Sequence, residues 1–317
     1  MIVGALVFVF LIIQDVYSMP NTRREIEKSE LSELRKRSDA PQSQKTLDCF
    51  DMVGIEGEYL YIPTDNADRT MLCTVYFIAN SMDELVDLRI RNIDMPCNEG
   101  GLQMFDGWNL GGDVFPSADE HDYPMEDRQF ETCGEDSEGV FISSQNVAMI
   151  SFPNSGRFQL FFRAKKNSRP CHAIAPDSSG EYNLLNYGER RNCSLFVIYP
   201  VKMSVIQMSV GDPTTETKLK CFNEPDQLQF LEGNGFDHAL MQTEQVLCGS
   251  TEMVEVEQEY ESVSRDTSNT TFVCNRVGLS IPLQCQSSAV RLISSGETEN
   301  HVRVKFSKIT SSVNECV

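Results

Sequence analysis

The sequence predicts an all-β protein made of two tandem antiparallel β-sandwich domains stapled by disulfides. Short runs rich in β-branched and aromatic residues recur along the chain, each bounded by Gly, Pro, Asn or Asp. No stretch of about 12 residues or more has a helical period. The 317-residue chain also contains 11 cysteines, and their wide spacing is typical of disulfides in an oxidising compartment.

The clearest predicted strands are 59–62, 73–78, 158–162, 195–199 and 302–306. In the last of these, Val302, Val304 and Phe306 alternate with Arg303 and Lys305. Such alternation predicts a strand with one face in the core and the other in solvent.

Residues 1–18 are predicted to be a cleaved signal peptide. An apolar run extends from Ile2 to Ile13, and Val16-Tyr17-Ser18 offers a cleavage site. The run is shorter than the roughly 20 residues that a membrane span needs, so no membrane anchor is expected. Residues 19–48 are polar and charged and are expected to form a disordered leader or linker. The leader contains Arg35-Lys36-Arg37-Ser38, which is consistent either with cleavage after Arg37 or with a solvated charged linker.

The charge balance excludes some classes of partner. Asp and Glu number 47 against 27 Lys and Arg, which gives a net charge of −20. This charge argues against nucleic acid and against anionic membrane surfaces, because both require basic patches. It permits a cationic or amphipathic peptide partner, although solubility alone also accounts for it.

A weak internal duplication divides the chain. Each copy contains a cysteine, an apolar-acid-Gly turn, a Cys-Gly pair and an apolar strand led by Ser-Ser. These features fall at Cys97, Phe105–Gly107, Cys133–Gly134 and 143–150 in the first copy, and at Cys221, Leu231–Gly233, Cys248–Gly249 and 287–293 in the second. The duplication predicts domains at 49–166 and 171–309, with an inserted acidic loop at 250–284 and a tail at 310–317.

This pattern resembles the CUB domain, an extracellular β-sandwich. More specific blocks resemble the corticotropin-releasing factor binding protein family: Cys49–Met52, Phe105–Trp108, Phe115–Ser117, Ser143–Ile150, Arg191–Ser194, Ile198–Val201 and Val290–Gly296. The resemblance extends from Cys49 to about Phe306. Its departures, in the leader, in residues 250–284 and at the C-terminus, indicate an invertebrate member.

The resemblance implies five disulfides: Cys49–Cys73, Cys97–Cys133, Cys171–Cys193, Cys221–Cys248 and Cys285–Cys316. Cys274 is left over, and it is either free, paired with another chain, or the partner of Cys316 in place of Cys285. Two sequons, at Asn192 and Asn269, predict N-glycosylation.

No catalytic motif is present, so we expect no enzyme, and no cofactor is expected. Many CUB domains bind calcium, and Asp106 lies where one ligand is usual. Asn98-Glu99 stands where another Asp would be expected, and Asp119-Glu120-His121-Asp122 is interpreted as a solvated loop. The prediction for metal sites is therefore none.

The resemblance implies a secreted trap that sequesters corticotropin-releasing-factor-like peptide hormones of the urocortin or diuretic-hormone type. Ligand binding in that family is associated with the strand around the first cysteine, where Asp51 matches an Asp and Lys45 takes the basic position. Asp51 is otherwise a surface turn residue. Trp108, the single Trp, is expected either to stack on the peptide or to pack beside the Gly107 turn. The alternative function is an extracellular CUB-type adaptor, with protein partners bound through calcium.

Overall fold

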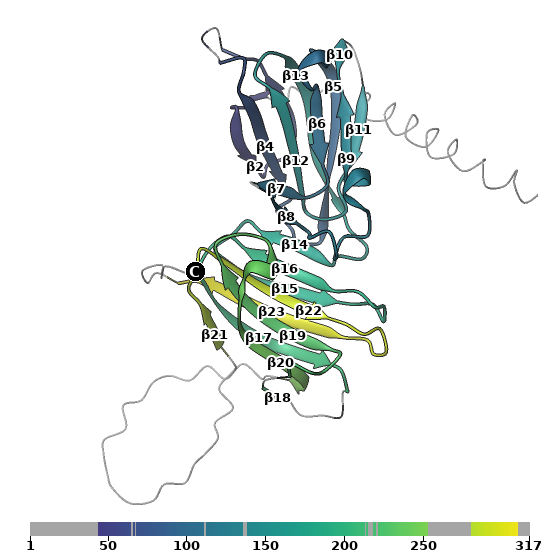
Figure 1. Ribbon diagram of the computed structural model, residues 1–317, viewed down its shortest axis with the longest axis vertical. Coiled ribbons are helices and arrows are strands. Elements are labelled where there is room, and N and C mark those ends of the chain that lie inside the picture. Colours follow the sequence, from purple (N-terminus) through teal and green to yellow (C-terminus); the bar gives the residue numbers. More distant parts are fainter. Residues whose placement is uncertain are drawn as a thin grey trace, which may run out of the picture. The chain divides into compact units, whose positions relative to one another are not determined.

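The computed structural model describes residues 44–309, apart from 65, 67, 111, 136–137, 213, 215–217, 220 and 253–279. The chain divides into two units, Met1–Gln44 and Lys45–Val317, and the described strands all belong to the second. This part of the chain contains 23 strands, three short 3-10 helices and no α-helix (Figure 1). The predicted all-β class is confirmed. The predicted signal peptide, most of the leader with Arg37, most of the 250–284 loop, Asn269, Cys274, Cys316 and the tail lie outside the described residues.

The first sandwich consists of two sheets and a small hairpin. One sheet has the order β1 (Lys45–Thr46), β3 (Gly57–Tyr61), β13 (Arg157–Lys166), β5 (Glu84–Met95), β10 (Gly134–Glu135), with β11 (Gly139–Ile142) also paired to β5. The other has the order β2 (Phe50–Val53), β4 (Leu72–Ile78), β12 (Val147–Pro153), β6 (Leu102–Phe105), β9 (Gln129–Thr132). The hairpin is β7 (Trp108–Leu110) and β8 (Asp113–Phe115), and the 3-10 helices are η1 (Cys97–Glu99) and η2 (Met125–Arg128).

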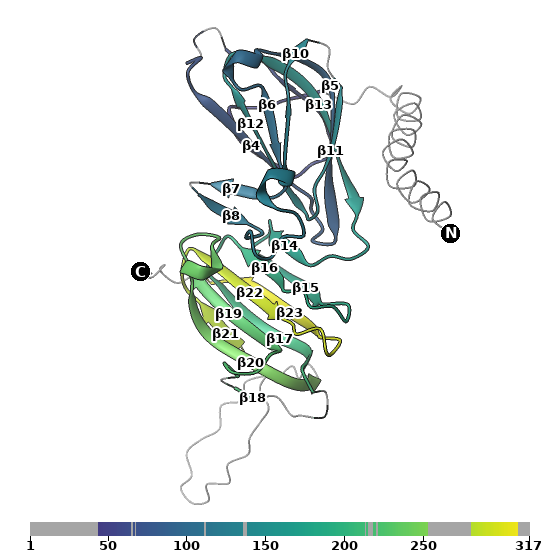
Figure 2. The same cartoon turned by 45° about the vertical axis from the view of Figure 1, so that its right-hand side comes forward.

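The second sandwich is one continuous sheet that folds into two layers (Figure 2). Its order is β14 (His172–Ala175), β16 (Cys193–Val197), β22 (Ser287–Ile293), β19 (Gln227–Gly233), β20 (Gln242–Glu252), β17 (Val201–Val210), β23 (His301–Lys308), β15 (Ser179–Leu185). β20 joins the layers, because its first half pairs with β19 and its second half with β17. The remaining elements are β18 (Lys218–Leu219), β21 (Ser280–Leu283) and η3 (His238–Leu240).

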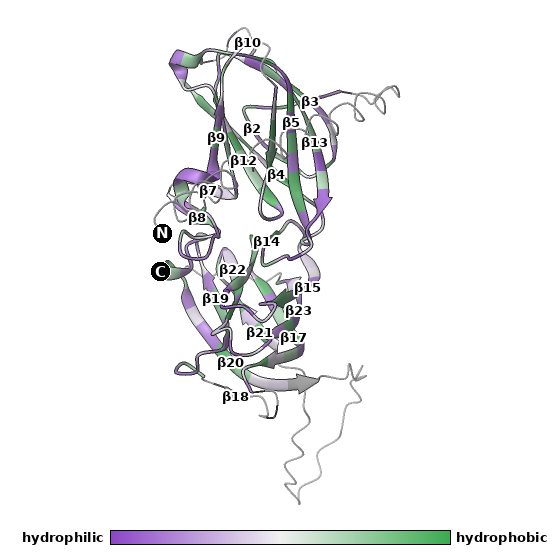
Figure 3. Ribbon diagram, turned by 90° about the vertical axis from the view of Figure 1, so that its right-hand side faces the viewer, coloured by the Kyte–Doolittle hydropathy of each residue, from purple (hydrophilic) through white to green (hydrophobic). Residues whose placement is uncertain are grey.

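Each sandwich has its own apolar core, and Figure 3 shows apolar residues concentrated along the central strands of both. In β23, Val302, Val304 and Phe306 are buried while Arg303 and Lys305 are exposed, as the alternation predicts. Each fully buried side chain of this size contributes roughly 1.5–3 kcal/mol. The strands therefore form where alternation gives every sheet one face to bury.

Four of the five expected disulfides are present. They join Cys49 to Cys73, Cys97 to Cys133, Cys171 to Cys193, and Cys221 to Cys248. Cys285 is also disulfide-bonded, and its partner lies outside the described residues.

The two sandwiches share one topology over four strands. In β2–β4–β12–β6 the first pair is parallel and the next two are antiparallel, and the same holds for β14–β16–β22–β19. The first disulfide of each sandwich reaches the second strand of the set, at Cys73 in β4 and Cys193 in β16. The Cys-Gly pairs also correspond, since Gly134 and Gly249 both have a φ of 92°. The strands therefore provide a residue-by-residue alignment of the two repeats.

Candidate functional site

Lys45 and Asp51 lie on neighbouring edge strands of the first sandwich. Residues 47–49 connect β1, at the edge of one sheet, to β2, at the edge of the other. The Lys45 Nζ donates to the Tyr59 hydroxyl at 3.3 Å and lies 5.2 Å from the centre of that ring. The Asp51 carboxylate accepts from the backbone N–H of Met52 at 2.8 Å. Among the described residues, neither side chain has an ion-pair partner.

Beside this edge, the outer face of the β2–β4–β12–β6 sheet is apolar and open. Cys73, Val75 and Phe77 of β4 point into the core, so Leu72, Thr74 and Tyr76 point outward. We call this surface the open face: it comprises Phe50, Met52, Leu72, Thr74, Tyr76, Gln103, Phe105, Met149 and Ser151. Phe50, Met52 and Leu72 are 65%, 49% and 58% exposed. A groove of about 520 Å³ runs over the part that Leu72, Tyr76 and Met149 line.

Of the two roles expected of Trp108, the structure supports packing. The ring is only 6% exposed. It stacks on Tyr76 with 3.9 Å between ring centres, and Phe236 of the second sandwich lies 5.0 Å away. The expected stacking of Trp108 on a peptide is therefore not supported, because protein side chains already cover the ring.

Trp108 belongs to an apolar cluster that joins the two sandwiches. The first sandwich contributes residues from β4, β12 and the β7–β8 hairpin, and the second contributes residues from β14, β16, β19, β22 and the segment around η3. The members are Ile78, Trp108, Phe115, Val147, Ile174, Phe196, Leu231, Phe236, Met241 and Ala289. The outer face of β14–β16–β22–β19, which we call the covered face, is thus buried by the first sandwich.

Polar side chains of the first sandwich complete this junction. Glu120 accepts from the Arg291 guanidinium, with 2.9 Å between Arg291 Nε and Glu120 Oε1, and from the Ser194 hydroxyl at 3.4 Å. Asn146 bonds both backbone groups of Ile174: it accepts from the N–H at 2.9 Å and donates to the carbonyl at 2.8 Å. The interpretation of residues 119–122 as a solvated loop is wrong for Glu120, which is 8% exposed because it lies against the second sandwich.

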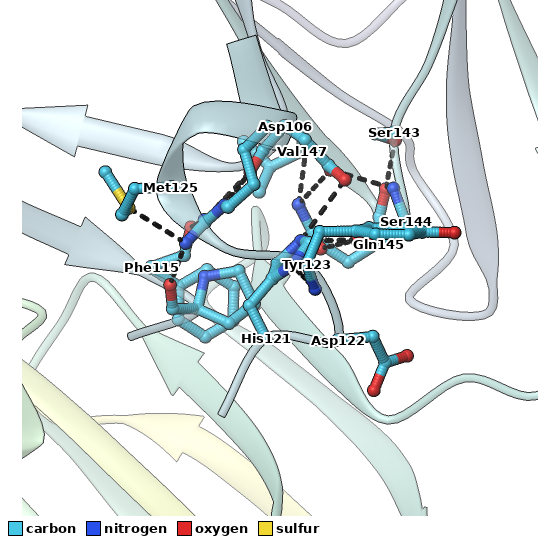
Figure 4. A network of polar contacts seen from close by, with 12 residues as sticks. Asp106, Phe115, His121, Asp122, Tyr123, Met125, Ser143, Ser144, Gln145 and Val147 are labelled. Atoms are coloured by element: carbon cyan, nitrogen blue, oxygen red, sulfur yellow. Dashed lines mark hydrogen bonds and ion pairs between the residues drawn. The ribbon is translucent and has the colours of Figure 1, made fainter. Parts of the chain in front are cut away.

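The acid-Gly turn of the first repeat is a fully engaged polar centre (Figure 4). One carboxylate oxygen of Asp106 accepts from the Ser144 backbone N–H and the Gln145 side-chain amide, both at 2.8 Å. The other lies 3.2 Å from Nε2 of His121, which is also 2.8 Å from the Ser144 hydroxyl. Among the described residues, no group of three or more His, Cys, Asp or Glu side chains has the arrangement of a metal site. Asp106 therefore stabilises this turn through its hydrogen bonds to Ser144, Gln145 and His121.

Arg128 holds the β7–β8 hairpin against the same turn. Its buried guanidinium donates to the backbone carbonyls of Asp106 at 2.8 Å, Pro116 at 2.8 Å and Phe115 at 3.3 Å. Burial lowers the pKa of Arg128 to about 10, so it remains charged at neutral pH. This cation fixes the hairpin that carries Trp108 and Phe115 onto the covered face.

The predicted glycosylation residue Asn192 is half-buried and lies directly before β16. Its side-chain oxygen accepts from the Ser294 backbone N–H at 3.3 Å. The cavity that it lines has a volume of about 790 Å³ and also includes Glu120, Arg191 and Glu297.

The fold and these surfaces define the class of protein: it is all-β, disulfide-stapled and made of two joined sandwiches. Models of the corticotropin-releasing factor binding protein match it twice, the N-terminal domain model over residues 42–166 and the C-terminal domain model over residues 173–283. The chain belongs to the corticotropin-releasing factor binding protein family.

Individual relatives agree with this assignment. The corticotropin-releasing factor-binding protein of Xenopus laevis is 28% identical over 291 residues, which cover 87% of this chain and 80% of the relative. The human protein of the same name is 28% identical over 281 residues, which cover 84% of this chain and 77% of the relative. The Ovis aries protein is 31% identical over 221 residues, covering 66% of each.

Among solved structures, the CUB1-EGF-CUB2 domains of rat MASP-1 are similar over 83% of this chain and 99% of that one, with 9% identity and a TM-score of 0.23. The CUB1-EGF-CUB2 domain of human MASP-1/3 is similar over 80% of this chain and 99% of that one, with 10% identity and a TM-score of 0.24. TM-scores of this size do not establish a shared arrangement, so the fold assignment depends on the strands and sheets described above.

Family membership fixes the broad nature of the protein. The family is one of binding proteins, which confirms the prediction that the chain is not an enzyme. The relatives and the several disulfides indicate an extracellular protein. None of the helices described here has the length and apolar character that a membrane span requires.

Proposed function

We propose that this protein is a secreted trap for corticotropin-releasing-factor-like peptide hormones of the urocortin or diuretic-hormone type. Binding sequesters the peptide and limits activation of its receptor. The observation that carries the proposal is that both family domain models match, one over the first sandwich and the other over the second sandwich up to residue 283. The described surface adds an apolar face beside a free cation and a free anion, which suits an amphipathic peptide.

Lys45 and Asp51 are the proposed charged contacts at the edge of the first sandwich. They lie on adjacent edge strands with no competing ion pair among the described residues. Trp108 acts indirectly in this proposal, because its stacking on Tyr76 fixes one side of the open face.

The proposal includes the route to the cell exterior. Residues 1–18 are removed as a signal peptide, Asn192 and Asn269 carry glycans, and residues 49–166 and 171–309 form the two domains. Mass spectrometry of the secreted chain identifies its N-terminus and its glycosylated sites. An unprocessed N-terminus at Met1 would contradict this part of the proposal.

The test is equilibrium binding of a synthetic corticotropin-releasing-factor-like peptide to the full secreted chain, with and without a calcium chelator. We expect saturable binding that survives chelation and weakens about tenfold in Asp51→Ala, as loss of one charged contact of about 1.4 kcal/mol implies. Asp177→Ala, which removes an exposed Asp of the second sandwich, is the matched control. No binding of any such peptide would contradict the proposal, and capture of protein partners that chelation abolishes would favour the adaptor function.

A further inference from the structure

We propose that the open face of the first sandwich binds the apolar side of the peptide. The covered face of the second sandwich binds apolar side chains of the first sandwich in the same way. The identity of the ligand rests on the proposed function. The position of the docking surface rests on the comparison of the two repeats.

Strand register makes the two faces equivalent position by position. Across the open face, Met52 pairs with Tyr76, Tyr76 with Met149, and Met149 with Phe105. Across the covered face the corresponding row is Ile174, Phe196, Ala289 and Leu231. All four residues of this second row belong to the apolar cluster that the first sandwich covers. In the corresponding row of the first sandwich, Met52 is half exposed, whereas Phe105 at the other end is buried under the Arg128 guanidinium.

The covered face shows what kind of partner such a row takes. Aromatic side chains, Trp108 and Phe115, pack on the apolar row. At the edge strand, Asn146 bonds the backbone N–H and carbonyl of Ile174. In the first repeat the equivalent backbone N–H belongs to Met52, and the carboxylate of Asp51 accepts from it at 2.8 Å. The Asp51 carboxylate therefore accepts the backbone hydrogen bond that the side-chain oxygen of Asn146 accepts in the second repeat.

The groove is continuous with the junction that covers the second face. Tyr76 lines the groove and also packs against the junction cluster, where it stacks on Trp108. Its hydroxyl donates to the Asn109 carbonyl at 3.3 Å. The outward-facing side chains of β4 thus form a single row that begins at the exposed Leu72 and ends at the buried Ile78.

The open face has the dimensions of a short helical segment. Three strand spacings from β2 to β6 span about 14 Å, and the four-residue step from Leu72 to Tyr76 spans about 13 Å. A helix rises about 1.5 Å per residue, so about nine residues fit, enough for anchors at three successive turns. The occupant is therefore one stretch of an amphipathic helix with two or three apolar anchors.

The two faces differ in charge, so they should bind different kinds of partner. Arg291 on the covered face binds the carboxylate of Glu120, but its equivalent on the open face is Ser151. Glu131 lines the groove and is exposed. The open face consequently favours a peptide whose apolar anchors are flanked by cationic side chains.

The test compares exposed apolar residues on the two sandwiches. Met52→Ser and Leu72→Ser should each weaken binding of a synthetic corticotropin-releasing-factor-like peptide about tenfold, since each removes one apolar contact of that size. Phe222→Ser and Leu240→Ser remove exposed apolar side chains of the second sandwich and should leave the affinity within about twofold. All four positions are at the surface, so folding is checked simply by circular dichroism.

Each outcome separates the inference from the proposed function. If the wild-type chain binds and all four variants bind equally well, the docking surface is wrong while the hormone trap stands. If the wild-type chain binds no such peptide, the proposed function fails and this occupant fails with it. If sedimentation shows a dimer that Leu72→Ser dissociates while peptide affinity is unchanged, the open face belongs to a second copy of the chain, which also overturns the inference.

Discussion

The two sandwiches differ in the exposure of the face that their common topology makes equivalent. In the second, Ile174, Phe196 and Leu231 are buried because the first sandwich supplies Trp108 and Phe115 to cover them. In the first, Met52 and Tyr76 occupy the equivalent row, and no described element of the chain buries Met52. A contiguous exposed apolar surface on a soluble protein usually marks a site of interaction. The difference therefore separates a face used for assembly within the chain from a face left for a partner.

The acid-Gly turns provide the largest expected contrast. Gly107 has a φ of 124°, and a Cβ there would lie 2.1 Å from the Phe115 carbonyl oxygen and 2.7 Å from the Arg128 guanidinium. The equivalent Gly233 would place its Cβ 3.0 Å from the flexible side chain of Met241. We expect Gly107→Ala to lower the free energy of unfolding by about 4 kcal/mol or more, and Gly233→Ala by about 1–2 kcal/mol.

Urea unfolding of both alanine variants measures this contrast. Equal losses at the two turns would contradict the assignment of Gly107 as the position that fixes the hairpin against the second sandwich.

The aromatic pair at equivalent positions of β16 and β4 should separate stability from binding. Phe196 is fully buried, so Phe196→Ala should cost about 3–5 kcal/mol of unfolding free energy. Tyr76 is half-buried, and Tyr76→Ala should cost about 1–2 kcal/mol while weakening peptide binding more than its effect on folding explains. Thermal unfolding together with peptide titration of both variants tests this, and a Tyr76 variant with unchanged affinity would argue against the open face.

The polar side of the junction gives the next contrast. The side chains of Arg291 and Glu120 are 9% and 1% exposed, so removing one partner with Arg291→Met should cost about 3 kcal/mol. Arg303 and Glu181 form a half-exposed ion pair between β23 and β15, whose coupling should be below about 1 kcal/mol. Double-mutant cycles on both pairs measure the two couplings. Couplings of equal size would mean that burial at the junction does not strengthen the first pair.

The covered face should also show a pH dependence, because His172 is buried in it. Burial lowers the pKa of His172 to about 4, below its ordinary 6.5, while nearby Glu120 and Asp122 raise it and Arg191 and His121 lower it. The unfolded chain therefore binds a proton that the folded chain does not between pH 6.5 and about 4. Stability is retained above pH 6.5 and falls as the pH drops through this window, by about 2–3 kcal/mol.

His172→Gln should flatten this part of the pH profile, because the amide does not titrate and keeps a hydrogen-bonding group beside Ser194. Denaturant unfolding at about pH 7 and about pH 4.5 provides the measurement. Parallel profiles for the wild type and the variant would show that His172 is not the group responsible.

Local signals in the sequence were sufficient for the strands and for part of the pairing. Alternation in β23 identifies its buried face, and the family resemblance gave the four disulfides that the structure contains. Alternation in β2 also indicates which of its residues face solvent. Phe50 and Met52 share a face opposite Asp51 and Val53, and the structure turns Val53 inward, which leaves Phe50 and Met52 outside.

The junction could not be predicted in this way. Glu120 meets Arg291 across 171 positions of sequence, and Trp108 meets Phe236 across more than one hundred. Nothing in the residues next to Glu120 distinguishes a solvated acid from one that binds a buried Arg, because burial there depends on the docking of the second sandwich.

Methyl NMR of methionine-labelled protein tests the central claim most directly. Met52 and Met149 lie on the open face, whereas Met203 and Met208 lie in the core of the second sandwich. Addition of a corticotropin-releasing-factor-like peptide should shift the Met52 and Met149 methyl signals and leave those of Met203 and Met208 in place. A bound peptide that leaves Met52 and Met149 unshifted would contradict the account, because the peptide would then occupy a different surface.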